Sequence, residues 1–229
     1  RNKAARDRDG VLRLSETGGA IKAIMPVFAM GLPADMDALR ALADEFDLPL
    51  IADAAAAIGA RYKSRPLAQM GADYTAVSFN GNKLITAGGG GAILCPSPEA
   101  AAQIKHLTST ARVGGAYDHD IVGFNYRMTN LQAAVGVAQL ERLDDFLQAK
   151  KRISDRYEEA FAGIQALFPF PSLEESNGSL WLSGIYAPDA SLAQLGLILY
   201  KLIQNGIEGR TFWKPIHQQT PYLECPVFL

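Results

Sequence analysis

The chain alternates strand-like and helix-like segments through its first two-thirds. Short apolar runs are typical of buried strands, and apolar residues at the spacing i, i+3, i+4, i+7 are typical of a helix. The expected strands are residues 20–29, 49–53, 74–79 and 92–94, and the expected helices are residues 34–47, a short one at 54–59 and one beginning at 97. This alternation predicts an α/β protein with a mostly parallel sheet, whose ligands bind at the carboxyl ends of the strands.

The pattern changes after residue 128. Residues 129–163 carry an apolar stripe that predicts one long helix, of the kind that crosses between domains or lies along a subunit interface. The segments that follow predict a smaller α+β unit with strands at residues 180–187 and 207–213 and a helix at 191–205. The expected division of the chain is a large domain over residues 1–128, a connecting helix over 129–163 and part of a C-terminal domain over 164–229.

Composition narrows the classes of function. The 229 residues carry a formal net charge of −2, so charge gives no reason to expect nucleic acid or an anionic membrane as a partner. No apolar run approaches the roughly 18 residues of a membrane span, and the first residues do not form a secretory signal. Cys95 and Cys225 are far apart, which excludes a disulfide scaffold and fits a reducing cytoplasm. The three histidines are too scattered to indicate a metal site.

The two ends of the chain lead to a further expectation. The sequence opens with Arg1 and stops at Leu229 without a closing helix or a polar tail. We therefore expect it to be a piece of a longer protein.

The main chemical candidate is Lys83, which lies in a loop of asparagine and glycine after an apolar strand. Asp53 and Ser78 stand at the ends of two expected strands, where ligands bind in α/β sheets. An amine, a carboxylate and a hydroxyl are what pyridoxal phosphate (PLP) requires: a covalent attachment, a partner for the pyridine nitrogen and a phosphate anchor. The alternatives are a solvated surface lysine at position 83 and a helix cap at Asp53.

Four consecutive glycines at residues 88–91 invite comparison with a nucleotide-binding loop. Such loops precede a helix, whereas the strand-like residues 92–94 follow here. The glycines therefore predict a tight turn near Lys83 rather than a nucleotide site.

Several ordered motifs resemble one known family. The stretches at residues 50–60, 77–86, 123–134 and 209–217 resemble those of the DegT/DnrJ/EryC1/StrS sugar aminotransferases, and the resemblance runs from about Met25 to Tyr222. It implies the aspartate-aminotransferase fold, PLP fold type I. This fold has a three-layer α/β/α large domain and a smaller α+β domain. It also implies PLP as the cofactor.

The resemblance assigns roles to individual residues. Lys83 matches the lysine that holds the cofactor covalently, Asp53 the partner of the pyridine nitrogen, and Ser78 the phosphate-binding serine. Asn125 matches an asparagine that reaches the phosphate from the neighbouring subunit, which implies a homodimer with shared active sites. The alternative for Asn125 is a turn residue before a helix cap at Thr129.

Other positions are assigned more loosely. Tyr126 and Arg127 are expected to structure the same loop as Asn125, with a surface salt bridge as the alternative for Arg127. Arg210 and His217 are candidates for substrate contacts, with a structural role as the alternative for each.

The chain also departs from the family pattern. Ala52 stands where members carry an acid, and Ala56 stands near the cofactor ring where members carry Gln, His or Glu. The family also extends further at both ends, and those parts complete the cofactor pocket and the small domain.

The motifs most resemble members that aminate 4-keto nucleotide sugars, of the legionaminic-acid and perosamine types, in bacterial surface-polysaccharide pathways. The implied reaction transfers an amino group, from glutamate, to such a sugar in the cytoplasm. Two alternatives remain. One is a family dehydratase, which carries histidine in place of the lysine and is opposed by Lys83. The other is a non-catalytic relative that dimerises through residues 123–145 without binding PLP.

Overall fold

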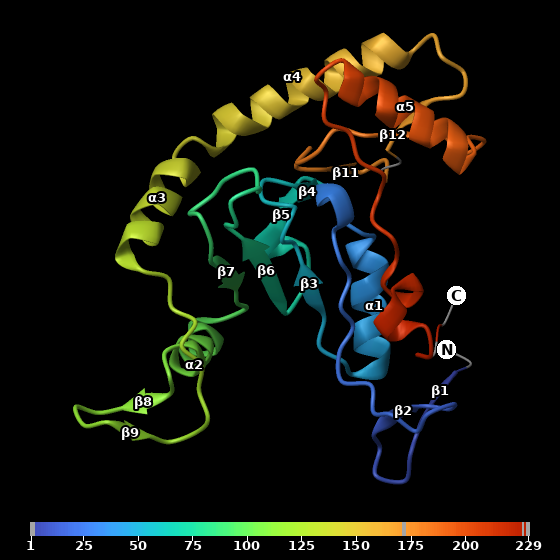
Figure 1. The fold of residues 1–229 in the computed structure, drawn as a ribbon. Helices are drawn as coiled ribbons and strands as arrows, with labels where there is room; N and C mark the ends of the chain where they lie inside the picture. Colours follow the sequence, from blue (N-terminus) through green and yellow to red (C-terminus); the bar gives the residue numbers. More distant parts are fainter. Residues whose placement is uncertain (1–2, 171–172, 226, 228–229) are drawn as a thin grey trace. The chain divides into compact units, whose positions relative to one another are not determined.

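The structure is a computed structural model that describes residues 3–170, 173–225 and 227. The chain divides into two units, which are described separately. The first comprises residues 1–163 and 169–185, and the second comprises residues 164–168 and 186–229. Figure 1 shows the order of the elements along the chain.

The first unit contains a central three-stranded sheet. Its strands are β3 (Ile51–Asp53), β6 (Tyr74–Ser78) and β7 (Gly91–Leu94), in the order β3-β6-β7. Strands β3 and β6 are parallel, with Asp53 opposite Ala76, whereas β6 and β7 are antiparallel. Of the two strand pairs in this sheet, one is parallel, as expected, and the other is antiparallel. The loop between β6 and β7 contains no helical crossover, and a parallel connection needs one.

The expected strand at residues 20–29 is not formed as a continuous element. The segment runs beside β3 and makes two isolated parallel bridges, Ile24 to Leu50 and Val27 to Asp53. The 3-10 helix η1 (Ala29–Gly31) then turns the chain away, with Met30 and Gly31 at positive φ. The turn interrupts the pairing that a longer strand would need.

Helix α1 (Met36–Phe46) confirms the helix expected at residues 34–47. Asp35 caps its first turn by accepting a hydrogen bond from the Ala38 N–H, and Asp47 ends it in the left-handed conformation. Met36 and Ala43 face the core. The core lies between α1 and the sheet, and its buried members are mostly alanines and large apolar residues: Phe28, Met36, Ala43, Leu50, Ala52, Ala54, Ala57, Ala60, Tyr62, Leu67, Met70, Val77, Phe79, Ile85 and Ala87.

The short helix expected at residues 54–59 is wrong. The Ala57 N–H bonds to the Ala54 carbonyl and the Ala60 N–H bonds to the Ala57 carbonyl, which makes two consecutive turns. Gly59 stands at φ +84, and this conformation stops the helical path.

The single helix expected at residues 129–163 is also wrong, because the structure has two helices. Helix α3 (Asn130–Leu140) begins with a capping box at Thr129, and α4 (Leu143–Phe161) follows it. At the break, the Arg142 N–H bonds to the carbonyl of Gln139, three residues back, and Arg142 leaves helical geometry. A tightened turn therefore separates two helices that share one apolar stripe in the sequence.

The remaining elements of the first unit are short, except for one helix. Helix α2 (Pro98–Thr108) begins at Ser97, whose side chain accepts a hydrogen bond from the Ala100 N–H, as the sequence predicts. The short elements are β1 (Ala4–Arg6), β2 (Leu12–Leu14), β4 (Arg61–Tyr62), β5 (Arg65–Pro66), η2 (Leu67–Gln69), β8 (Arg112–Val113), β9 (Asp118–His119) and β11 (Ser176–Asn177).

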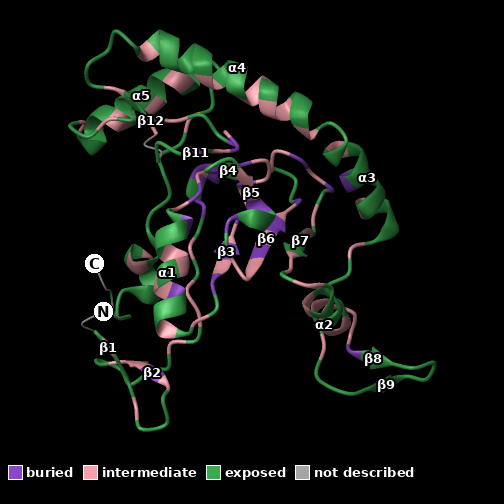
Figure 2. Cartoon of the chain, turned by 180° about the vertical axis from the view of Figure 1, so that it is seen from behind, coloured by how far each residue is buried: buried purple, intermediate pink, exposed green. Residues whose placement is uncertain are grey.

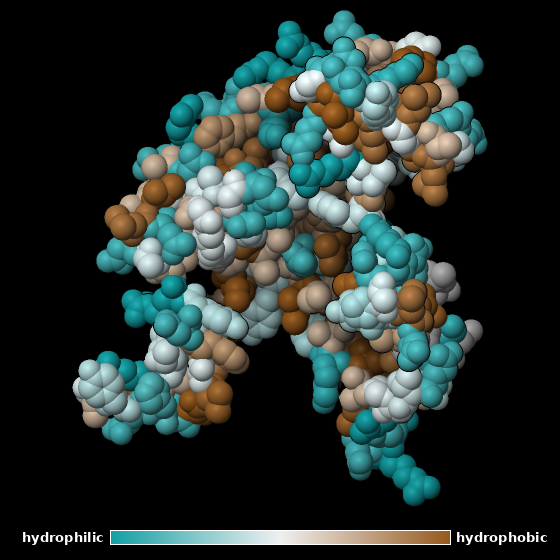
Figure 3. Space-filling model, in the orientation of Figure 1, coloured by the Kyte–Doolittle hydropathy of each residue, from teal (hydrophilic) through white to brown (hydrophobic). Residues whose placement is uncertain are grey.

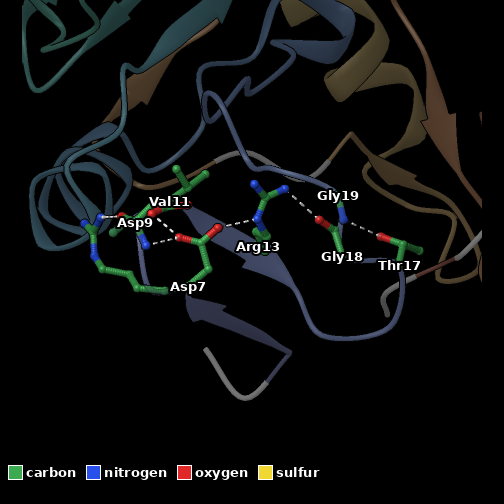
Figure 4. A network of polar contacts seen from close by, with 9 residues as sticks. Asp7, Asp9, Val11, Arg13, Thr17, Gly18 and Gly19 are labelled. Carbon is green, nitrogen blue, oxygen red and sulfur yellow. Dashed lines mark hydrogen bonds and ion pairs between the residues drawn. The ribbon is translucent and has the colours of Figure 1, made fainter.

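The β1–β2 hairpin is held by one carboxylate. Asp7 accepts hydrogen bonds from the backbone N–H groups of Asp9 and Val11, and from Arg13 at 2.5 Å (Figure 4). These bonds lower the pKa of Asp7, because each of them favours the ionised carboxylate. The charged side chain of Asp7 therefore closes the turn of the hairpin.

The second unit is built around α5 (Leu192–Gln204), which confirms the helix expected at residues 191–205. Ser191 forms a capping box with Gln194. The short helices η3 (Ile216–Gln218) and η4 (Thr220–Tyr222) follow α5. Strands β10 (Phe168–Pro169) and β12 (Ile185–Tyr186) lie where the chain passes from one unit to the other.

Of two strands expected near this boundary, the first is formed only in part and the second is not formed. Within residues 180–187 only β12 is a strand, because Leu180 takes a positive φ of 53° that breaks an extended backbone. Residues 207–213 are irregular, because the described part of the chain provides no strand to pair with them. An extended segment becomes a strand only where a second backbone takes up its hydrogen bonds.

Candidate functional site

Two residues predicted for the site end neighbouring strands. Asp53 is the last residue of β3 and Ser78 is the last residue of β6. Because the strands are parallel, both side chains lie at the same edge of the sheet. Asp53 pairs with Ala76, so Ser78 is two residues further on. The two α-carbons are therefore roughly 8 Å apart, from the strand rise and the strand spacing.

Local hydrogen bonds fix the Asp53 backbone. The Asp53 carbonyl accepts a hydrogen bond from the Phe28 N–H, and one carboxylate oxygen accepts from the Ala55 N–H at 3.0 Å. The second of these bonds is an Asx turn, which leaves the other oxygen of the half-buried carboxylate for a further partner. The alternative expected for Asp53 was a helix cap. No helix follows it, so its side chain closes a turn instead.

The loop after β6 carries Lys83 back toward this edge. The Ser78 hydroxyl oxygen accepts a hydrogen bond from the Asn80 N–H at 3.2 Å, and the Lys83 N–H bonds to the Asn80 carbonyl at 3.0 Å. These two bonds close a compact polar turn of the type that the asparagines and glycine of this loop predict.

Lys83 is half-buried and interacts with Asp53. Burial lowers the pKa of the Lys83 amine, because desolvation disfavours the ammonium form, and the negative charge of Asp53 partly opposes this. The structure therefore places an amine with a lowered pKa within electrostatic range of a carboxylate at the edge of the sheet. A solvated surface lysine does not describe this environment.

An aromatic side chain covers the amine. The Lys83 nitrogen lies 4.0 Å from the centroid of the Trp181 ring. The indole N–H donates to the Asn82 carbonyl at 2.7 Å. Nearby, the Ser179 hydroxyl donates to the carbonyl of Ala56 at 2.7 Å.

The sequence reasoning missed Trp181 and Ser179. Trp181 lies in the expected strand at residues 180–187, and Ser179 comes just before it. A signal in the sequence is Gly178, which stands between Asn177 and Ser179, three residues before the tryptophan, since a glycine inside a strand-like stretch often marks a close approach of backbones. In the structure a Cβ at position 178 would stand 2.7 Å from the Leu32 side chain, so the backbone does approach closely there.

The residues at this edge fit PLP. They supply an amine, a carboxylate and a hydroxyl within one unit, and Asp53 and Ser78 are separated on the scale of a substituted pyridine ring and its phosphate. Ala56 adds no polar side chain here, and its carbonyl is occupied by Ser179. The polar contact that the family has at this position is therefore missing from the side chain.

Other predicted residues lie elsewhere in the first unit. Asn125, Tyr126 and Arg127 are exposed, and Asn125 forms an isolated bridge with Ser109. Tyr126 stacks on Phe124 with ring centroids 5.2 Å apart. This segment follows the β8–β9 hairpin, which projects away from the central sheet in Figure 1. The described contacts do not join these residues to Lys83.

Arg210 and His217 belong to the second unit. Arg210 is exposed and donates to the Glu208 carboxylate at 2.9 Å through Nε. His217 is half-buried in η3. The salt bridge at Arg210 is local to its own loop, and the structure assigns neither residue a ligand.

The described residues contain no cluster of three or more His, Cys, Asp or Glu side chains that could hold a metal ion. Within the same described residues, no helix combines the length and the apolar character needed to cross a bilayer.

The fold places the chain among the aminotransferases of fold type I. Helicobacter pylori PseC, an aminotransferase involved in the biosynthesis of pseudoaminic acid, superposes with a TM-score of 0.83 at 24% identity over 89% of this chain and 56% of PseC. The PLP form of Spr1654 from Streptococcus pneumoniae superposes with a TM-score of 0.79 at 28% identity over 88% of this chain and 57% of that protein.

Sequence comparison then gives the family. Residues 15–226 match the DegT/DnrJ/EryC1/StrS aminotransferase family, and the chain belongs to that family. The GDP-perosamine synthase of Vibrio cholerae is 39% identical over 205 residues, which are 88% of this chain and 54% of that protein. The chain spans about half the length of the curated relatives it matches.

Proposed function

We propose that this chain carries the cofactor-binding half of a PLP-dependent sugar aminotransferase. The observation that carries the proposal is the half-buried Lys83 amine beside the Asp53 carboxylate, at the strand edge where Ser78 also lies. A structural lysine has no need of a neighbouring strand-end carboxylate and a hydroxyl, whereas PLP needs all three groups.

Bound PLP would supply an electron-withdrawing pyridinium ring that stabilises negative charge at a substrate carbon. The Asp53 carboxylate keeps a proton on the pyridine nitrogen, since a negative charge beside it favours the protonated form. Its bond to the Ala55 N–H fixes one oxygen and aims the other. The Ser78 hydroxyl would donate a hydrogen bond to the phosphate.

Lys83 binds the cofactor and moves a proton. An amine attacks a carbonyl carbon only in its neutral form, and burial of Lys83 raises the fraction in that form. With PLP bound, the Lys83 amine would act as a general acid–base, taking a proton from the substrate carbon and giving it to the cofactor carbon.

The substrate class comes from the relatives. The V. cholerae relative is named a GDP-perosamine synthase, and PseC is an aminotransferase of pseudoaminic acid biosynthesis. We therefore propose a 4-keto nucleotide sugar as acceptor and glutamate as donor. Asn125 would reach the phosphate in the partner subunit of a homodimer, which accounts for its exposure in a single chain. Arg210 and His217 would contact the substrate.

The test is covalent mapping of the cofactor. PLP is added to the full chain, the absorption spectrum is recorded, the sample is reduced with borohydride, and the modified peptide is located by mass spectrometry. We expect an absorption band near the edge of the visible range and a label on Lys83, both lost in Lys83→Arg. Lys63, an ion-paired lysine of the same unit, is the internal control. Absence of the label on Lys83 would contradict the proposal and favour a family relative that does not bind PLP.

A further inference from the structure

The aromatic cover of Lys83 comes from far along the chain. Trp181 is 6% exposed, and its ring centroid lies 4.0 Å from the Lys83 nitrogen. This distance is well within the roughly 6 Å over which a ring face attracts an ammonium group. Trp181 is therefore in direct contact with the group on which the proposed function depends.

The segment that delivers the ring is anchored at its start. We call residues 176–181 the strap. Ser176 pairs with Tyr62 between β11 and β4. The Ser179 N–H bonds to the Gly31 carbonyl at 3.0 Å, and the Ser179 hydroxyl bonds to the Ala56 carbonyl at 2.7 Å. The strap therefore crosses the turn that follows Asp53.

The ring itself is fixed at two points. The indole N–H of Trp181 donates to the carbonyl of Asn82, the residue before Lys83. The Trp181 carbonyl accepts a hydrogen bond from Lys150 of α4 at 2.9 Å. Both the backbone and the ring plane are thereby held, and the ring cannot turn away from the amine without breaking the bond to Asn82.

We propose that Trp181 is a positioning residue for Lys83: its ring face stabilises the protonated amine until PLP or substrate binds. An indole ring favours an ammonium group over a neutral amine, because its face carries negative electrostatic potential. The ring of Trp181 therefore opposes the lowering of the Lys83 pKa by burial. It keeps a larger fraction of the amine protonated, and the protonated amine is not nucleophilic.

The charged groups around the amine come from different elements. Asp53 at the end of β3 favours the ammonium form, as does the ring of Trp181. Lys150 of α4 is a second cation, but it is directed to the Trp181 carbonyl. Substitution at position 181 removes the contribution of the ring and leaves the carboxylate in place.

The experiment measures the titration of Lys83 in the full chain without cofactor. Acetic anhydride labels lysines only in the neutral form, so the yield at Lys83 against pH, read by mass spectrometry, gives the midpoint of that residue alone. Trp181→Leu and Trp181→Phe both remove the indole N–H, but only the phenylalanine keeps a ring. We expect the midpoint to fall by roughly one pH unit in Trp181→Leu and by less in Trp181→Phe.

A matched control removes a different aromatic–cation contact. The Arg112 guanidinium lies 4.4 Å from the ring centroid of the exposed Tyr117. Tyr117→Leu is expected to leave the Lys83 midpoint unchanged. Circular dichroism checks that each variant is folded. An unchanged midpoint in Trp181→Leu, a raised midpoint caused by exposure of the amine, or equal shifts in the leucine and phenylalanine variants would overturn the proposal.

The catalytic meaning of this contact rests on the function proposed for Lys83, but the contact itself does not. Titration without PLP tests the role of Trp181, whereas borohydride mapping with PLP tests the role of Lys83. A normal label on Lys83 with no shift in Trp181→Leu would reject only the positioning role. A shift without a label would reject only the cofactor role.

Discussion

Helices α1 and α5 begin in the same way but end up in different surroundings. Asp35 caps α1 and Ser191 caps α5, each by accepting a hydrogen bond from a backbone N–H three residues on. Helix α1 buries Met36 and Ala43, whereas no residue of α5 is buried. Figure 2 shows the difference in colour along the two helices.

The apolar residues of α5 are those that remain exposed. Leu192 is 84% exposed and Ile203 is 60% exposed. Apolar side chains of this helix show as brown at the upper right of Figure 3. Caps are encoded within four residues, whereas burial depends on residues far away in the sequence. A helix is thus predictable from its own sequence even where its packing is not.

The largest expected effect on stability comes from adding a Cβ at a glycine, and it differs between a glycine in a packed region and one in an open region. Gly31 has φ +80, and a Cβ there would stand 2.6 Å from the Ala56 carbonyl oxygen and even closer to Ser179. Gly206, just after α5, has φ +72 with nothing nearby. We expect Gly31→Ala to lower the free energy of unfolding by about 4 kcal/mol and Gly206→Ala by about 1 kcal/mol. Urea denaturation followed by circular dichroism measures both, and equal losses would show that the close approach at Gly31 is absent.

The next effect compares the two helices directly. Met36 of α1 is 0% exposed and Leu197 of α5 is 54% exposed. Truncation to alanine removes buried contacts only in the first case. We expect Met36→Ala to destabilise the chain by about 3 kcal/mol and Leu197→Ala by less than about 0.5 kcal/mol. The midpoints of thermal unfolding check this, and a large loss for Leu197→Ala would mean that α5 is covered in solution.

The smallest effect concerns the cap of α1 and its pH dependence. Hydrogen bonds from the Tyr62 hydroxyl and the Ala38 N–H lower the pKa of Asp35. Its contribution to stability is therefore present above the unfolded-state pKa of about 3.9 and is lost as pH falls through the lower folded-state value. We expect Asp35→Asn to flatten the fall of the unfolding free energy below about pH 4.

Tyr62→Phe is the companion variant, because it removes the donor that lowers the pKa of Asp35 most. It should flatten the same acid limb in part. An acid limb that is as steep in Asp35→Asn as in the unaltered chain would contradict the assignment. Urea titrations at a series of pH values give the slopes.

Local signals predicted much of the fold. Pro98 after Ser97 marks the start of α2, and a run of apolar residues before Asp53 marks β3. The errors arise where contacts with residues distant in the sequence determine the backbone conformation. Residues 207–213 lack a pairing strand in the described chain, and Leu180 takes a positive φ within the strap.

The candidate site likewise contains residues that local sequence predicts and a residue that it does not. Asp53 and Ser78 were predicted at strand ends, and they lie there, because a strand end is a local feature. Trp181 was not predicted, because its contact with the Lys83 loop crosses 99 residues of sequence. The roles of these residues in catalysis stay predictions until the cofactor is mapped.

The long span between Asn82 and Trp181 also sets the order in which the parts of the site are synthesised. At a translation rate of roughly 5–20 residues per second, the ring of Trp181 leaves the ribosome some 5–20 s after the Lys83 loop. During that interval the nascent chain already contains every residue of β3 and β6 but not the cover of the amine. The lysine on which the proposed chemistry depends is therefore made, together with Asp53 and Ser78, well before the ring that covers it.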